Sequence, residues 1–260
     1  MALTDDQIRS GATLLAEARR SGTLLDGLGD NEPTTVAEAE AMADLNAEIL
    51  GWEVVGWKLG CTSLEAQQIL SSPGPFAGRM YAPTAFVDGH LPANALQRPI
   101  AECEFGFVTG ADVAPSDRSW NRADLLATIE SIVPTIEFVD SRFQDFAGAG
   151  YLNHTADHGA NGGFICGSAV RVADVGDLAT TAVSVVKNGT EVKEGTGAAV
   201  MDSPWHALGW LYEHLGQRGI NLPAGSVISS GTCTGVIPVD VGDTVTASFA
   251  EIGDVTVARS

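Results

Sequence analysis

The chain has 260 residues, 45 % of them hydrophobic, and a formal net charge of −19. This composition supports a sizeable core and excludes wholesale disorder, and no apolar run is long enough to span a bilayer. The negative charge argues against nucleic acid as a partner, because a polyanion is bound by a basic surface.

Residues 1–50 predict two helices that serve as scaffold. Thr4-Asp5-Asp6-Gln7 and Thr35-Val36-Ala37-Glu38 are capping boxes, and apolar residues follow each at helical spacing. The second helix is expected to turn Val36, Ala39, Met42, Ala43 and Ile49 inward. The N-terminal segment lacks the basic region and apolar core of a secretory signal, so we expect a cytoplasmic protein.

A short strand is predicted over residues 52–60, and Lys58 lies inside its apolar run. A lysine at a strand edge usually extends its amine into water, whereas a lysine held in a pocket can act as an acid or a base. Prolines and glycines in residues 71–83 predict an irregular loop. Arg79 in that loop would either contact an anionic ligand or lie at the surface.

The next strand, residues 101–107, has two different faces. Its odd-numbered residues are all apolar, and Glu102 and Glu104 share the opposite face. Two neighbouring carboxylates repel each other and lose favourable solvation on burial, and a divalent cation would relieve both effects. The alternative is that this face is the solvent side of an antiparallel sheet.

Another acid interrupts a later apolar strand. After a helix predicted over 122–132, residues 134–140 form a strand in which Glu137 is flanked by Ile136 and Phe138. Glu137 is the natural third metal ligand. Ligation by oxygen alone favours Mg²⁺ or Mn²⁺ over zinc.

Residues 147–163 are rich in glycine and predict a long loop. His154 and His158 are four residues apart, which would suit zinc on a helix. The glycines argue against a helix, and the metalloprotease signature is missing, so the sequence does not favour zinc.

The remaining sequence is mostly β in character. Asn188-Gly189 predicts a hairpin, Ser203-Pro204 opens a helix that Gly219 ends, and further strands follow over 227–235, 244–249 and 255–258. The cysteines are far apart in sequence and are expected to be reduced and mostly buried. We predict one α+β domain over 1–260, in which the helical part, 1–50, packs on the sheet of the β-rich catalytic part, 51–260.

Several segments occur in an order typical of a known family. They are Trp57-Lys58-Leu59-Gly60-Cys61-Thr62, Glu102-Cys103-Glu104, Ile136-Glu137-Phe138-Val139-Asp140, residues 157–167, Asn188-Gly189 with Gly195-Thr196-Gly197-Ala198-Ala199-Val200, and Ser230-Gly231-Thr232-Cys233-Thr234-Gly235. Over almost the whole chain, this order resembles the 2-keto-4-pentenoate hydratase and 4-oxalocrotonate decarboxylase family, which is related to the fumarylacetoacetate hydrolase fold.

The resemblance implies a mixed β-roll with flanking helices and a Mg²⁺ or Mn²⁺ site. It implies that Glu102, Glu104 and Glu137 are the metal ligands and that Lys58 is the catalytic lysine. It also implies a small-molecule 2-oxo acid substrate of aromatic catabolism and a homo-oligomer. A complex of this homo-oligomer with a pathway enzyme is compatible with the resemblance.

The function implied is that of a lyase that hydrates a 2-hydroxy-2,4-dienoate to a 4-hydroxy-2-oxo acid through an enolate held on the metal. The alternatives are decarboxylation of a 2-oxo-3-enedioate, hydrolysis of a C–C bond in an acylpyruvate, and a non-catalytic partner subunit. Arg79, Asn161 and Thr232 are the candidate substrate contacts, and a role in a turn or at the surface is the alternative for each. Asn161 stands where the family commonly has serine, which bears on the substrate.

Overall fold

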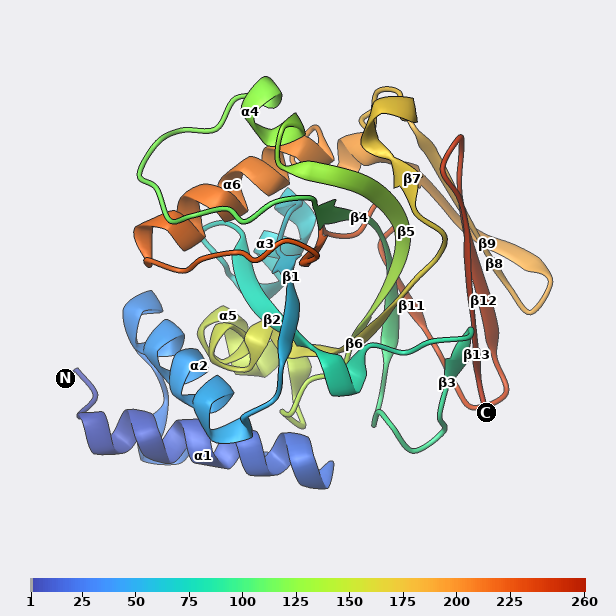
Figure 1. The fold of residues 1–260 in the computed structure, drawn as a ribbon. Helices are drawn as coiled ribbons and strands as arrows, with labels where there is room; N and C mark the ends of the chain where they lie inside the picture. Colours follow the sequence, from blue (N-terminus) through green and yellow to red (C-terminus); the bar gives the residue numbers. More distant parts are fainter. Residues whose placement is uncertain (1) are drawn as a thin grey trace.

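The computed structural model describes residues 2–260, which form two sheets and several helices (Figure 1). The larger sheet has eight strands in the order β2-β1-β10-β4-β5-β6, with β11 paired to β4 and β7 to β5. Its strands are β1 (Val54–Gly60), β2 (Phe76–Tyr81), β4 (Ile100–Thr109), β5 (Ile129–Val139), β6 (Asn161–Cys166), β7 (Val170–Arg171), β10 (Val227–Ser229) and β11 (Val236–Pro238). In this sheet β1 and β10 are parallel and the other pairs are antiparallel.

The second sheet has five strands in the order β3-β13-β12-β8-β9. They are β3 (His90–Leu91), β8 (Ala182–Lys187), β9 (Thr190–Thr196), β12 (Thr244–Phe249) and β13 (Gly253–Arg259). Figure 1 shows this sheet and the helices α1 and α2 on opposite sides of the curved strands β4 and β5. The predicted mixed α+β fold with N-terminal helices is confirmed.

The helices are α1 (Asp5–Ser21), α2 (Val36–Leu50), α3 (Leu64–Leu70), α4 (Arg122–Leu126), α5 (Phe146–Ala156) and α6 (Pro204–Gln217). Short 3₁₀ turns are η1 (Gly29–Asn31), η2 (Ala82–Thr84), η3 (His158–Ala160), η4 (Val172–Asp174) and η5 (Gly197–Ala199). Both predicted capping boxes are present, at Thr4 and Thr35. Within residues 2–260, no helix combines the length and hydrophobicity needed to cross a membrane.

The helices α1 and α2 pack on each other and on α5, and they reach the larger sheet at Tyr81 of β2. Met42 is fully buried in this contact, but Val36 is 43 % exposed. The expectation that Val36 points inward is therefore wrong, because it lies in the first turn of α2, beyond the packed stripe.

The main core lies on the apolar face of β4. The side chains of Ala101, Cys103, Phe105 and Phe107 are fully buried there. They pack with residues of the second sheet and of α6 in one cluster. Glu102 and Glu104 lie on the opposite face of β4, outside this core. All cysteines are free; Cys166 is half-buried and the others are buried.

Three local predictions are wrong. Residues 71–83 contain β2 (Phe76–Tyr81), because residues 76–81 pair with β1. The helix expected over 122–132 is only α4, because β5 begins at Ile129 and is buried between β4 and β6.

The third correction concerns residues 147–163, which hold α5, η3 and the start of β6 rather than a loop. The Asp145 side chain accepts a hydrogen bond from Gly148 N and caps α5. Gly150 takes a left-handed conformation, with φ of 71°, and interrupts the helix without ending it.

Candidate active site

The pairing of β4 with β5 brings the acids together. Glu102 and Glu137 are direct partners in this antiparallel pair, and Glu104 is on the same face of β4 as Glu102. One carboxylate oxygen of each residue lies within 4.8 Å of the others. Glu104 and Glu137 are fully buried and Glu102 is half-buried. This burial argues against the solvent-face alternative.

The carboxylates are held by donors from other strands. Glu104 Oε2 accepts hydrogen bonds from Ser229 Oγ at 2.5 Å and from Gly231 N at 2.8 Å. Glu137 Oε1 accepts one from Asn161 Nδ2 at 2.7 Å. Glu104 Oε1 and Glu137 Oε2 accept no hydrogen bond within the described chain. Glu104 Oε1 has no partner, and Glu137 Oε2 faces only the Lys58 ammonium, at 3.3 Å, so both oxygens can bind a cation.

Lys58 comes from β1 and is 2 % exposed, so its amine does not extend into water. Its Nζ donates a hydrogen bond to Gly159 O at 3.0 Å and lies 3.3 Å from Glu137 Oε2. Gly159 makes room for this side chain, because a Cβ at residue 159 would lie 2.9 Å from Lys58 Cδ. Lysine and acids thus form one buried cluster.

Burial and mutual repulsion govern the ionisation of the cluster. Burial raises the pKa of Glu137 to about 7. Repulsion by Glu102 also raises this pKa, whereas Lys58 and the hydrogen bond from Asn161 lower it. Burial and the other two acids raise the pKa of Glu104 well above its usual value. Burial lowers the pKa of Lys58, but attraction by Glu137, Glu102 and Glu104 outweighs it, and the net shift is upward.

The donor set fits a hard divalent cation. One ammonium group cannot neutralise three carboxylates in a buried site, and all free ligand atoms are oxygens. The role of Glu102, Glu104 and Glu137 as metal ligands stays a prediction.

A cavity of about 300 Å³ opens beside this cluster. Lys58, Glu102 and Thr232 line it together with a largely apolar set: Leu59, Gly60, Cys61, Thr62, Ser63, Ala66, Ile69, Leu70, Phe76, Ile100, Val139, Phe146, His154, Gly159, Ala160 and Val236. Its size suits a small organic acid. A hollow of about 500 Å³ at α5 is larger, but its lining includes neither Lys58 nor any of the acids Glu102, Glu104 and Glu137.

The expected substrate contacts lie in different places. Thr232 lines the cavity, and its Oγ1 donates to Gly235 O at 2.9 Å. Asn161 is buried behind Glu137. Arg79 is outside the lining: its Nη2 lies 2.6 Å from Asp44 Oδ1, and its guanidinium stacks over Trp57. The geometry gives no support to a substrate contact by Arg79.

A turn that the sequence did not single out positions the lysine. His158, Gly159 and Ala160 all have φ between 54° and 68°. His158 Nε2 lies 2.9 Å from Asn46 Oδ1 and 2.7 Å from Tyr81 Oη. Since an amide oxygen only accepts, Nε2 carries the hydrogen. These contacts tie the turn to α2 and β2, and the turn presents Gly159 O to Lys58.

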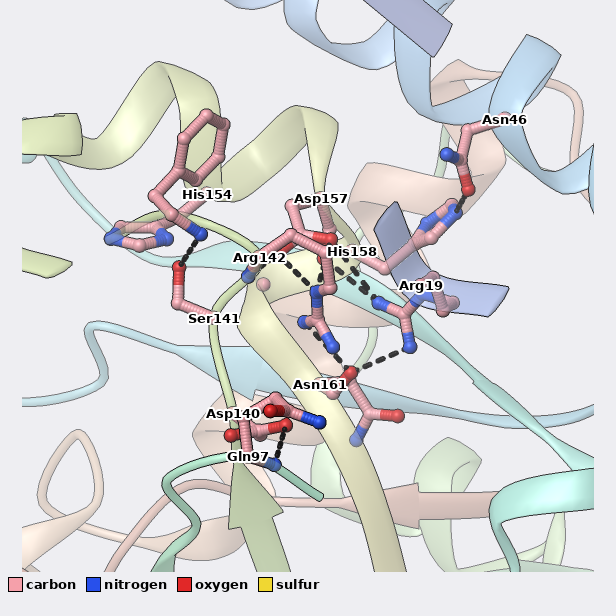
Figure 2. Close-up of polar contacts among 12 residues, drawn as sticks. Arg19, Asn46, Gln97, Asp140, Ser141, Arg142, His154, Asp157, His158 and Asn161 are labelled. Carbon is pink, nitrogen blue, oxygen red and sulfur yellow. Dashed lines mark hydrogen bonds and ion pairs between the residues drawn. The ribbon is translucent and has the colours of Figure 1, made fainter. Parts of the chain in front are cut away.

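Figure 2 shows the buried charges that hold Asn161. The guanidinium of Arg142 donates to both oxygens of Asp157 at 2.9 Å and to Asn161 O at 3.0 Å. Arg19 of α1 donates to Asn161 O at 2.7 Å. The N-terminal helix therefore supports the residue that orients Glu137. His154 bonds instead to Phe146 O, so His154 and His158 do not form a zinc site.

Comparison with known proteins identifies the family. Residues 75–258 match the family described as fumarylacetoacetate (FAA) hydrolase C-terminal. The chain belongs to this family. Within it, the chain is 30 % identical over 258 residues to a 2-keto-4-pentenoate hydratase of Paraburkholderia xenovorans, covering 97 % of this chain and 95 % of the relative. It is 33 % identical over 249 residues to a 2-hydroxyhexa-2,4-dienoate hydratase of Comamonas testosteroni, covering 93 % of each.

A solved structure from the same family superposes over the whole chain. It is a 4-oxalocrotonate decarboxylase from Pseudomonas putida G7 complexed with magnesium and adipate, with a TM-score of 0.90 and 28 % identity, covering 100 % of this chain and 99 % of that one. The resemblance to hydratases and decarboxylases of the fumarylacetoacetate hydrolase family is thus confirmed.

Proposed function

We propose that this protein is a metal-dependent lyase that hydrates a 2-hydroxy-2,4-dienoate to a 4-hydroxy-2-oxo acid. The observation that carries the proposal is the buried cluster of Glu102, Glu104 and Glu137 around Lys58, beside a cavity of about 300 Å³. The hydratase names of similar chains support this choice of reaction.

In this proposal the three carboxylates hold Mg²⁺ or Mn²⁺. When bound, the cation supplies Lewis acidity for the carboxylate and C2 oxygen of the substrate. Asn161 keeps one oxygen of Glu137 occupied, and Ser229 with Gly231 does the same for Glu104. Each of these two acids is left with one oxygen that accepts no hydrogen bond and can bind the cation, and at Glu137 this oxygen also faces the Lys58 ammonium.

Lys58 moves the proton. Its ammonium gives a proton to C5 of the dienol, the proton of the 2-hydroxyl passes through water back to the Lys58 amine, and a 2-oxo-3-enoate results. Water then adds across the C3–C4 double bond, with the hydroxyl on C4 and a proton on C3, so the sum is one water added. The acids hold Lys58 protonated and therefore ready to donate, and a cation beside them would lower its pKa toward the working range.

Decarboxylation of a 2-oxo-3-enedioate is the second candidate. It is supported by the fold shared with the magnesium-complexed decarboxylase. The same lysine and acids would serve as CO₂ leaves and the carbon chain is protonated. A homo-oligomer, a complex with a pathway enzyme and a cytoplasmic location stay predictions.

The test uses purified protein with Mg²⁺ or Mn²⁺. We expect consumption of 2-hydroxypenta-2,4-dienoate with formation of 4-hydroxy-2-oxopentanoate, followed by absorbance and mass spectrometry, and loss of turnover in a chelator. Release of CO₂ from 4-oxalocrotonate without hydration of the dienoate would establish the second candidate instead.

A further inference from the structure

The wall of the cavity formed by helices is almost entirely apolar. It consists of Ala66, Ile69 and Leu70 from α3 and Phe146 and His154 from α5, and we call it the helical wall. Lys58 is the only lysine or arginine among the described residues that line the cavity. Lys58 belongs to β1 and lies against Glu137, and the helical wall itself contains no lysine or arginine.

His154 is the polar exception in this wall. It is fully buried, and its ring packs between Phe146, with centroids 4.5 Å apart, and Phe143, with centroids 6.1 Å apart. These contacts fix the orientation of the imidazole. Figure 2 shows His154 turned away from the charges of Arg142 and Asp157.

The tautomer of His154 follows from its one hydrogen bond. Nε2 lies 2.7 Å from Phe146 O, and a carbonyl oxygen can only accept, so Nε2 carries the hydrogen. Burial lowers the pKa of His154, so the ring is neutral near pH 7. Nδ1 is then a bare lone pair, and it has no partner in the described chain. A buried acceptor without a donor is costly, so this atom fits a ligand that brings a hydroxyl.

We propose that His154 Nδ1 accepts a hydrogen bond from a hydroxyl on the tail of the bound 2-oxo acid, and that the cavity selects uncharged, hydroxyl-bearing tails over tails that end in a second carboxylate. The inference rests on the proposed function, which supplies the site for the 2-oxo acid head. A second carboxylate would face a lone pair and apolar side chains, with no cation to offset its desolvation. The 4-hydroxyl of the hydration product is the kind of donor that the site would accept.

The test measures binding rather than turnover. Calorimetry in the presence of Mg²⁺ compares pyruvate, which has no tail, with 2-oxopentanoate, 4-hydroxy-2-oxopentanoate and 2-oxoadipate. We expect 4-hydroxy-2-oxopentanoate to bind about tenfold more tightly than 2-oxopentanoate, and 2-oxoadipate to bind at least about tenfold more weakly than 2-oxopentanoate.

Variants assign the effect to His154. His154→Phe should remove the advantage of the hydroxyl and leave pyruvate and 2-oxopentanoate unchanged, whereas His154→Asn keeps an acceptor and should restore part of it. His206→Phe, at an exposed histidine outside the cavity, is the control.

The outcomes separate the two proposals. If pyruvate binds but 2-oxoadipate equals 2-oxopentanoate, or if the hydroxyl advantage is absent or survives in His154→Phe, the inference is overturned and the proposed function stands. If no 2-oxo acid binds with Mg²⁺, the proposed function fails and the inference with it. The comparison of ligands on the unaltered protein remains decisive if His154→Phe does not fold.

Discussion

Glu102 and Glu137 lie directly opposite each other on β4 and β5, although like charges in this position destabilise a sheet by up to about 1 kcal/mol. Glu104, two residues along β4, adds a third acid that is fully buried. Lys58 supplies only one compensating charge. A bound divalent cation would compensate the remaining negative charge of the three acids, and the first two predictions test this.

Glu104→Gln should abolish tight binding of Mg²⁺ or Mn²⁺ while the fold is kept. The substitution preserves shape and removes a buried charge, so we expect at least about a 100-fold weaker cation affinity. The metal-free variant should be about 1 kcal/mol more stable than the metal-free wild type, because a repelled carboxylate is gone. Calorimetric titration and chemical denaturation measure both effects. Normal cation binding by the variant would rule out the proposed ligand set.

Lys58→Met should retain the cation and lose the reaction. Without the ammonium no group donates the proton, and we expect kcat to fall by about 10³-fold. Metal affinity should be equal or higher, because a positive charge 3.3 Å from Glu137 has been removed. Single-turnover kinetics at saturating Mg²⁺ provide the measurement. Unchanged kinetics would exclude Lys58 from the mechanism.

His158→Gln should reduce the loss of stability in acid. Burial, with Arg19, Arg79 and Arg142 nearby, lowers the pKa of His158 well below its usual value. Below about pH 6.5 the unfolded chain therefore takes up a proton that the native state refuses, and this contribution to the free energy of unfolding falls by up to about 1.4 kcal/mol per pH unit. Above that pH the effect vanishes.

Urea denaturation of the wild type and of His158→Gln between pH 5 and 8 measures this contribution as a difference, in which groups common to both proteins cancel. His206→Gln, at an exposed position of α6, is the matched control and should follow the wild type. Parallel curves for wild type and His158→Gln would show that His158 does not carry the acid sensitivity.

Arg79→Ala should leave substrate binding unchanged. Arg79 pairs with the half-exposed Asp44 and stacks on Trp57, outside the cavity lining. Asp44 keeps a second partner, Arg218 Nη2 at 2.8 Å, so we expect a loss of only about 1 kcal/mol in stability. KM and the melting temperature are the measurements. A large rise in KM with normal stability would return Arg79 to the site.

The sequence by itself determined the structural features that depend only on residues close together in the chain. The alternation along residues 101–107 separates an apolar face from Glu102 and Glu104, and the capping boxes at Thr4 and Thr35 begin α1 and α2. These features follow from the two-residue period of a strand and from hydrogen bonds within one helical turn, so local sequence suffices to predict them.

Only the tertiary structure decided which distant groups meet. The register of β4 with β5 places Glu137 opposite Glu102, and the order β1-β10-β4 brings Lys58 to the acids. Residues 76–81 form a strand because they pair with β1, and Arg79 on this strand lies outside the cavity. Long-range hydrogen bonds place the His158 turn beside Lys58. Register and packing depend on contacts across the whole chain, and no local pattern contains that information.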